Sequence, residues 1–156
     1  MEIENKLAAM GLELPNPTTP PAHRSSAVRT GNLVFVGGHV PRMPDGGMLH
    51  PGKLGLDVTV EQGYEAAQRV MLNCLGSLKG EIGDLDKVTR VVKLLCMVNS
   101  APGFGDQPRV ANGATDLLGN LYGDRGRHAR SAVGLEKGTG QNSGGIEIEM
   151  IVEIQD

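Results

Sequence analysis

The sequence predicts a single α+β domain of element order ββαβαββ, in which two helices cover one face of a sheet. At 156 residues the chain is long enough for one core and too short to indicate two. Two segments repeat apolar residues at helical spacing and alternate with short runs rich in β-branched residues. Strand-helix-strand therefore occurs twice, which is typical of an α+β sandwich. The other face of the sheet stays bare in one chain, so we expect a homo-oligomer.

The N-terminal segment predicts an arm ahead of this domain. Residues 2 to 10 can form a short helix. The stretch 'LPNPTTPPA' that follows must be extended, because proline disfavours helix at the residue before it. We therefore divide the chain into an N-terminal arm, residues 1–22, and one domain, residues 23–156.

The first two strands come from 'SAVRTGNLVFVGGHVP', where the polar turn Thr30-Gly31-Asn32 separates two β-branched runs. The runs predict strands from Ser26 to Arg29 and from Leu33 to Val36. Gly37 and Gly38 end the second strand without side chains, which indicates a bulge or a close approach by other atoms.

The middle of the chain predicts helix, strand and helix in turn. A capping-box pattern, Thr59-Val60-Glu61-Gln62, starts a helix that runs to about Lys79 and stops at Gly80 and Gly83. The apolar segment 87 to 99 follows as a strand. Segment 109 to 122 has one apolar stripe and predicts the second helix.

Two strands close the chain, from Ala129 to Leu135 and from Ile146 to Ile154. The second alternates apolar and acidic residues, so Glu147 and Glu149 point to the same face. The connection contains 'GTGQNSGG', which joins two strands and not a strand to a helix. We interpret it as a hairpin loop and not as a dinucleotide-binding loop.

Composition disfavours several classes of function. The formal net charge is -3, and 2 Phe, 2 Tyr and no Trp leave few platforms for stacking bases, so we expect no nucleic-acid partner. No apolar run reaches membrane-spanning length, so we expect no membrane partner and a cytoplasmic location. No zinc-ligand spacing or phosphate-binding loop is present, so we expect no metal and no cofactor. Cys74 and Cys96 lie in apolar segments and predict buried free thiols.

Arg130 is the first candidate site residue, because it stands at the start of a strand in 'RGRHARSAV'. A guanidinium on a rigid strand presents a planar fork of donors that suits a carboxylate, which predicts a small anionic ligand. The alternative is an ion pair with Glu147 or Glu149 on an adjacent strand. Arg125 and Arg127 lie in the glycine-rich turn, where we expect solvated charges.

The two glutamates are candidates for general-base chemistry, since a carboxylate beside an arginine stays ionised and can orient or deprotonate water. Alternatively, the two glutamates are only outward-facing polar residues of a half-buried strand.

Four motifs in order, 'GNLVFVGGHVP', 'RVANGATDLL', 'HARSAVG' and 'IEIEMIVEI', resemble the RidA/YjgF family of reactive intermediate (enamine/imine) deaminases. The likeness covers Arg24 to Ile154 and is strongest to a longer branch with an N-terminal extension. It implies a chorismate-mutase-like fold and a homotrimer whose sheets form a central barrel, with ligand sites between subunits. It also implies hydrolysis of 2-imino or 2-enamino acids to 2-oxo acids and ammonia, without metal or organic cofactor.

The resemblance assigns roles to individual residues. Arg130 falls on the arginine that clamps the substrate carboxylate, and Glu147 on the acidic residue that positions the attacking water. Gly38 matches a glycine that lines the pocket, and Asn112 the asparagine of the second helix. Ala132 stands where the family often has cysteine.

Other departures from the family surround the same pocket. Arg24 stands at a family tyrosine, and Gly37-Gly38-His39 replaces Ser-Gly-Gln. Arg24 in the cleft would favour a larger or more anionic ligand. His39 is either an acid or base near Arg130 or a polar wall or surface residue. The last connection is longer and richer in glycine than the family's usual turn, which leaves the register of the last strand open, so Glu149 is the alternative to Glu147.

We therefore expect a cofactor-independent enamine/imine deaminase or related hydrolase. The alternative from another class is a non-catalytic trimer that binds a small carboxylate as a sensor or stabilising partner. Ribonuclease activity is a label often attached to the family. The negative net charge of the chain and its small number of aromatic residues disfavour it.

Overall fold

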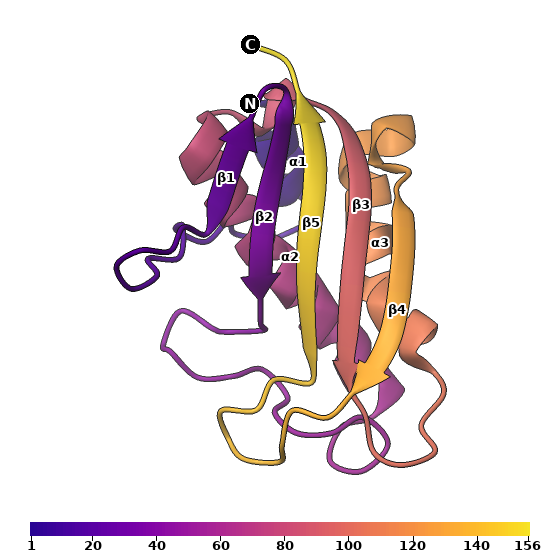
Figure 1. The fold of residues 1–156 in the computed structure, drawn as a ribbon. Helices are drawn as coiled ribbons and strands as arrows, with labels where there is room; N and C mark the ends of the chain where they lie inside the picture. Colours follow the sequence, from indigo (N-terminus) through magenta and orange to yellow (C-terminus); the bar gives the residue numbers. More distant parts are fainter.

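The computed structural model describes all 156 residues, and a five-stranded sheet forms its centre (Figure 1). The predicted order ββαβαββ is confirmed, and so is the short helix predicted ahead of it. The strands lie side by side in the order β1-β2-β5-β3-β4. Only β3 and β4 are parallel neighbours. The strand bounds are Ala27–Thr30 (β1), Leu33–His39 (β2), Val88–Asn99 (β3), Ala129–Leu135 (β4) and Ile146–Ile154 (β5).

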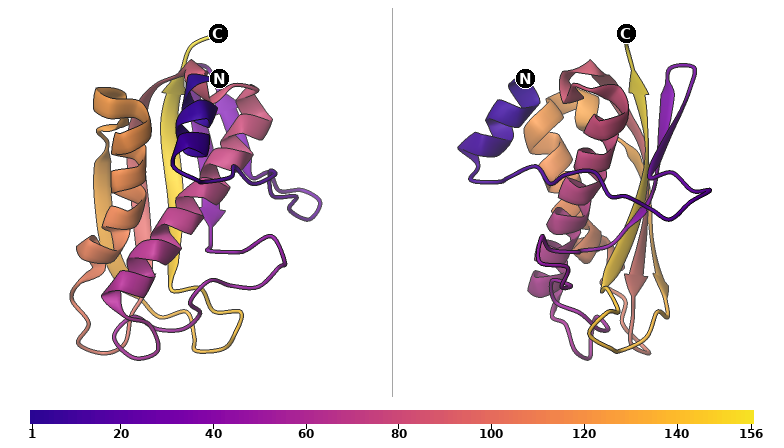
Figure 2. Two further views of the ribbon diagram at one scale, coloured as in Figure 1. Left: turned by 180° about the vertical axis from the view of Figure 1, so that it is seen from behind. Right: turned by 90° about the vertical axis from the view of Figure 1, so that its left-hand side faces the viewer.

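Three helices lie on one side of the sheet: α1 (Glu2–Ala9), α2 (Val60–Ile82) and α3 (Gln107–Tyr122). Figure 2 shows α2 and α3 against the sheet and α1 outside them. Two short 3-10 helices, η1 (Leu85–Lys87) and η2 (Gly123–Gly126), follow α2 and α3. None of the helices is both long enough and apolar enough to cross a membrane.

α2 begins with the predicted capping box and ends later than predicted. The Thr59 hydroxyl accepts from the Gln62 N–H at 3.1 Å, and the Gln62 amide oxygen accepts from the Thr59 N–H at 3.0 Å. The prediction that Gly80 stops the helix is wrong, whereas the same prediction for Gly83 is confirmed: the helix ends at Ile82 and Gly83 caps it with φ of 86°. Gly80 instead makes room for the arm, because a Cβ there would lie 2.6 Å from Cγ of Pro17.

β4 and β5 do not form the predicted hairpin, because β3 lies between them. β4 follows α3 and pairs parallel with β3 at the edge of the sheet, since parallel neighbours need a crossover connection such as α3. β5 then fills the gap between β2 and β3 and pairs antiparallel with both. The predicted alternation along β5 is confirmed, with Glu147 and Glu149 on the helix-free face.

The glycine pair in β2 produces both features predicted for it. The register with β5 shifts between Val36 and His39, so Gly37 and Gly38 form a bulge. A Cβ at Gly38 would also overlap the carboxylate of Glu147. Glycine here therefore permits a carboxylate to lie directly on the backbone.

The helix-free face of the sheet carries exposed apolar side chains. The cross-strand register puts Val28, Phe35 and Ile151 in one row, and Met97 and Val133 in another. Val28 is 53% exposed and Phe35 42%. A sheet face of this kind calls for a covering partner.

Cys74 and Cys96 are free and buried, as predicted. Burial raises the pKa of both thiols, that of Cys96 to about 11. Both are therefore uncharged at neutral pH and poor nucleophiles.

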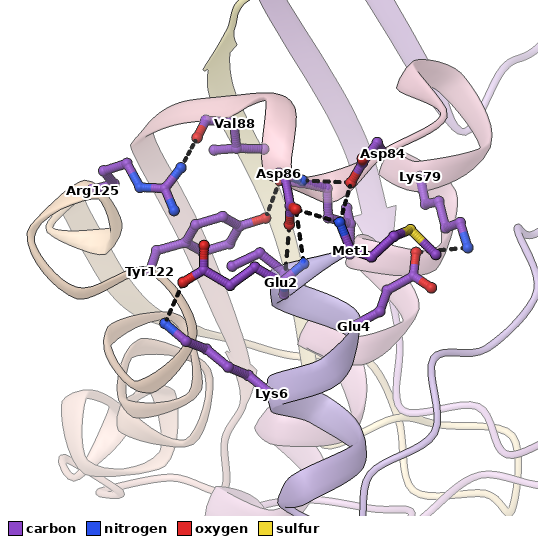
Figure 3. Close-up of polar contacts among 12 residues, drawn as sticks. Met1, Glu2, Glu4, Lys6, Lys79, Asp84, Asp86, Val88, Tyr122 and Arg125 are labelled. Carbon is purple, nitrogen blue, oxygen red and sulfur yellow. Dashed lines mark hydrogen bonds and ion pairs between the residues drawn. The ribbon is translucent and has the colours of Figure 1, made fainter.

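Asp86 of η1 anchors α1 to the domain (Figure 3). Its carboxylate accepts from the N–H groups of Glu2 at 2.8 Å and Ile3 at 2.9 Å, and it also binds the Met1 ammonium. These donors lower the pKa of Asp86 to about 2. At the other end of α1, Lys6 donates to the Leu121 carbonyl at 3.1 Å.

We expect Asp86→Ala to lower the free energy of unfolding by about 1 kcal/mol, because the helix loses its cap. Urea unfolding at pH 7 measures this, with Glu81→Gln as control for loss of an exposed charge. The pKa of folded Asp86 lies below its ordinary value, so the cap is complete above pH 4 and is lost as pH falls toward 2. Equal stabilities of Asp86→Ala and the wild type at pH 7 would contradict the anchoring.

Arg125 is not the solvated turn charge that we predicted. Its guanidinium donates to the Val88 carbonyl at 2.8 Å and lies 5.3 Å from the ring centre of Tyr122 (Figure 3). It ties η2 to the start of β3, whereas Arg127 is exposed as expected.

Candidate functional site

Arg130 lies on the helix-facing side of edge strand β4 and is held by α3. One guanidinium nitrogen donates to the Asn112 side-chain oxygen at 2.8 Å and to the Thr115 hydroxyl at 3.0 Å. Both partners are neutral, and Arg130 forms no ion pair within the chain. The alternative of an ion pair with Glu147 or Glu149 is therefore wrong.

His128 extends this network. Its Nδ1 lies 2.7 Å from the Gly126 carbonyl, which can only accept, so Nδ1 carries the proton. Nε2 then accepts from the Thr115 hydroxyl at 3.0 Å, which leaves the Thr115 lone pairs for Arg130. Burial, with a smaller effect of the Arg130 charge, lowers the pKa of His128. A neutral His128 thus fixes the side-chain orientation of Thr115 and, through it, Arg130.

A cleft of about 370 Å³ opens beside this network. Seven residues line it, and none is acidic: Asn112, Thr115, Gly119, Gly126, Arg127, His128 and Arg130. Its two arginines make it suited to an anion. We call it the Arg130 cleft.

Glu147 lies on the other side of the sheet, between Gly38 and Lys137. The Lys137 ammonium pairs with Oε1 of Glu147. Oε2 rests over Gly38 and accepts no hydrogen bond within the chain. The Lys137 backbone is itself held, because its N–H donates to the buried Asn99 side chain at 2.9 Å. Oε2 is therefore the free acceptor of this carboxylate.

A single chain does not bring Arg130 and Glu147 together. Arg130 is opposite Leu94, which is fully buried under the helices, whereas Glu147 is opposite Met97 on the helix-free face. β3 also separates their strands. The two residues therefore form two half-sites on opposite faces.

The remaining predicted site residues lie at three places in the chain. Arg24, Gly38 and His39 line one cavity beside β2. Ala132 lies on the same side of β4 as Arg130, opposite the buried Cys96. Glu149 faces a separate hollow on the helix-free face.

His39 is a buried polar wall and not a surface residue. It is 6% exposed, its Nδ1 lies 2.6 Å from the Gly37 carbonyl, and its Nε2 lies 2.8 Å from the Ser77 hydroxyl. Burial lowers its pKa.

Three residues of the half-sites were missed from the sequence: Thr115, His128 and Lys137. Thr115 was detectable, because it stands one helical turn after Asn112 and shares its face. His128 was visible next to Arg130 in the basic stretch. Lys137 gave no signal, because its pairing depends on how a ten-residue loop folds back. No group of three metal-ligating side chains converges anywhere in the structure.

Comparison with known proteins identifies the family of this chain. A family model described as "YjgF/chorismate mutase-like, putative endoribonuclease" matches residues 4–135. Protein TCP17 of Trypanosoma cruzi is 38% identical over 153 residues, which cover 97% of this chain and 94% of that protein.

Two solved structures are similar over their whole length. Protein Atu1372 of Agrobacterium tumefaciens has a TM-score of 0.88 at 37% identity, with 99% of this chain and 94% of that chain covered. A "putative endoribonuclease" of Shewanella oneidensis has a TM-score of 0.91 at 27% identity, with 99% and 100% covered. The resemblance found in the motifs is thus confirmed, and the chain belongs to the YjgF/chorismate mutase-like family.

Proposed function

We propose that this protein hydrolyses small 2-imino or 2-enamino acids, or a related carboxylate-bearing molecule, to the 2-oxo acid and ammonium. The observation that carries the proposal is the state of Arg130: its guanidinium is oriented by Asn112 and Thr115, lines a cleft and has no carboxylate partner. A guanidinium held in this way is preorganised to bind the substrate carboxylate.

The proposal requires two chains at each site. The half-sites occupy opposite faces of the sheet, and the helix-free face needs a cover. A head-to-tail interface joins different surfaces of two copies and closes into a ring when the rotation allows it. We therefore propose a homotrimer in which the Arg130 cleft of one chain meets Glu147 of its neighbour.

Glu147 then acts on water. Its free Oε2 accepts a proton from a water molecule as the water oxygen attacks the carbon of the protonated imine. The resulting carbinolamine has one hydroxyl and one amino group on that carbon. Glu147 returns this proton to the amino nitrogen. The C–N bond then breaks while the carbinolamine hydroxyl loses its proton to the Glu147 carboxylate, so that the 2-oxo acid and ammonia form. Ammonia takes up that proton and leaves as ammonium, and Glu147 is again a carboxylate. Positioning and one general base suffice, because a protonated imine is already electrophilic.

The ion pair of Glu147 with Lys137 favours a second candidate, a non-catalytic carboxylate-binding trimer. Lys137 engages one oxygen of the carboxylate and would restrict its movement as a base. This protein would bind the carboxylate at Arg130 without turnover.

The test generates a 2-imino acid in situ with an amino acid oxidase and follows its decay. We expect acceleration by the wild type that is lost in Arg130→Ala and in Glu147→Gln and retained in Glu149→Gln, which removes the neighbouring charge. Loss in Glu149→Gln alone would reassign the base. Carboxylate binding without acceleration supports the second candidate, and sedimentation of the wild type tests the trimer. Cleavage of RNA by the same preparation would contradict both.

A further inference from the structure

The N-terminal arm forms one wall of a cavity of about 670 Å³ beside β2. The arm-walled cavity is lined by the arm, by the start of the domain, by the β2 bulge and its continuation, and by one residue of α2. Its lining includes Thr18, Thr19, Arg24, Ser25, Gly38 and Arg42.

The wall formed by the arm is fixed in place. The Thr18 N–H donates to the Ser77 hydroxyl at 3.2 Å, and the Thr18 hydroxyl contacts Ser26 and Ser77. Behind it, the arm lies directly on α2, where a Cβ at Gly76 would overlap the Pro15 carbonyl. The arm is therefore fixed at the point where it enters the cavity wall, before any ligand binds.

The chemistry of the lining favours an anion. Two arginines and no acidic residue line the cavity. Arg24 is exposed and pairs with no acid of the chain. Arg42 uses one donor on the Gly46 carbonyl at 2.7 Å, and a guanidinium has five. Hydroxyls of Thr19 and Ser25 add neutral donors.

The cavity adjoins the Glu147 half-site through Gly38. Gly38 lines the cavity, and the carboxylate of Glu147 rests on it. A molecule whose reacting carbon lies at Glu147 would therefore extend its far end toward Arg24 and Arg42.

We propose that the arm-walled cavity binds a second anionic group of the substrate, a carboxylate or a phosphate. The preferred substrates are then 2-imino acids that carry a second acidic group. This inference rests on the proposed function for the reacting end of the molecule. It assigns a role to the arm, which shapes the site for the far end.

The test measures binding of 2-oxoglutarate and of 2-oxopentanoate, which has the same five-carbon chain without the second carboxylate. One charge-assisted hydrogen bond is worth about 1.5–3 kcal/mol, so we expect the diacid to bind about tenfold tighter or more. The ratio falls to near one in Arg24→Ala and in Arg42→Ala. Arg29→Ala keeps it, because Arg29 pairs with Asp156 and lines neither this cavity nor the Arg130 cleft. 3-Phosphonooxypyruvate in place of the diacid tells whether phosphate is preferred.

Equal affinities for the two acids, or a ratio that survives in both cavity variants, would overturn the inference. These outcomes are distinct from failure of the proposed function. If no imine is hydrolysed but the preference for binding the diacid is intact, only the proposed deaminase activity is contradicted. If imines with one and with two acidic groups are hydrolysed with equal kcat/KM, only the second anionic subsite is contradicted.

Discussion

Gly113→Ala is expected to lower the free energy of unfolding by about 1–3 kcal/mol, the cost of overpacking a close contact. A Cβ at Gly113 would overlap the carbonyl oxygen of Tyr64 on α2 and lie 3.1 Å from Cβ of Ala67. The Tyr64 carbonyl belongs to the helix backbone and cannot rotate away. α2 and α3 would have to separate, and urea unfolding followed by circular dichroism measures the loss.

Gly119→Ala is the matched control on the same helix. No atom lies within 4 Å of its added Cβ. Alanine is a better helix former than glycine by about 1 kcal/mol, so this variant should be slightly more stable than the wild type. The two substitutions are chemically identical and have opposite expected signs. A stabilised Gly113→Ala would show that α2 and α3 do not approach as described.

The close approach at Gly113 also matters for the site. Asn112 and Thr115, the two side chains that hold Arg130, stand on either side of this contact on α3. A shift of α3 away from α2 would move both relative to β4. We therefore expect Gly113→Ala to weaken carboxylate binding as well as stability.

The fold was largely predictable because its determinants are local. The capping box of α2, the stripe of α3 and the alternation of β5 each lie within one segment, and each was confirmed. Strand order was not predictable from these patterns, since pairing depends on contacts between distant segments. The interpretation of the last connection as a hairpin failed for this reason: neighbours in sequence are separated by β3.

The site residues, too, were predictable from local motifs, whereas their arrangement in space was not. Arg130 and Asn112 were identified from motifs and lie in one hydrogen-bonded network. The separation of Arg130 from Glu147 could not be read from the sequence, because it depends on which face of which strand each occupies. Gly80 was misread as a helix stop because the pattern gave no indication of the arm that packs on it.

Gly38→Ala is expected to reduce kcat/KM for imine hydrolysis by about a hundredfold, the cost of misplacing a reacting group by about 1 Å. The added Cβ would overlap Oε2 of Glu147 and lie 3.0 Å from its carboxyl carbon. Unlike the obstacle at Gly113, this one is the end of a flexible side chain, 32% exposed, which can move aside. The carboxylate would then leave the position in which its free oxygen can orient water. Stability should be nearly unchanged, which separates a displaced base from a damaged fold.

Gly37→Ala gives the control one residue earlier in the same bulge. Its added Cβ would lie 3.5 Å from the nearest atom, the Ser26 carbonyl, which is an ordinary contact. Backbone strain is not involved at either glycine, because neither has a positive φ. We expect Gly37→Ala to retain most of the activity. Equal activity of the two variants would mean that the position of Glu147 over Gly38 has no part in catalysis, and the base would have to be sought elsewhere on the helix-free face, beginning with Glu149.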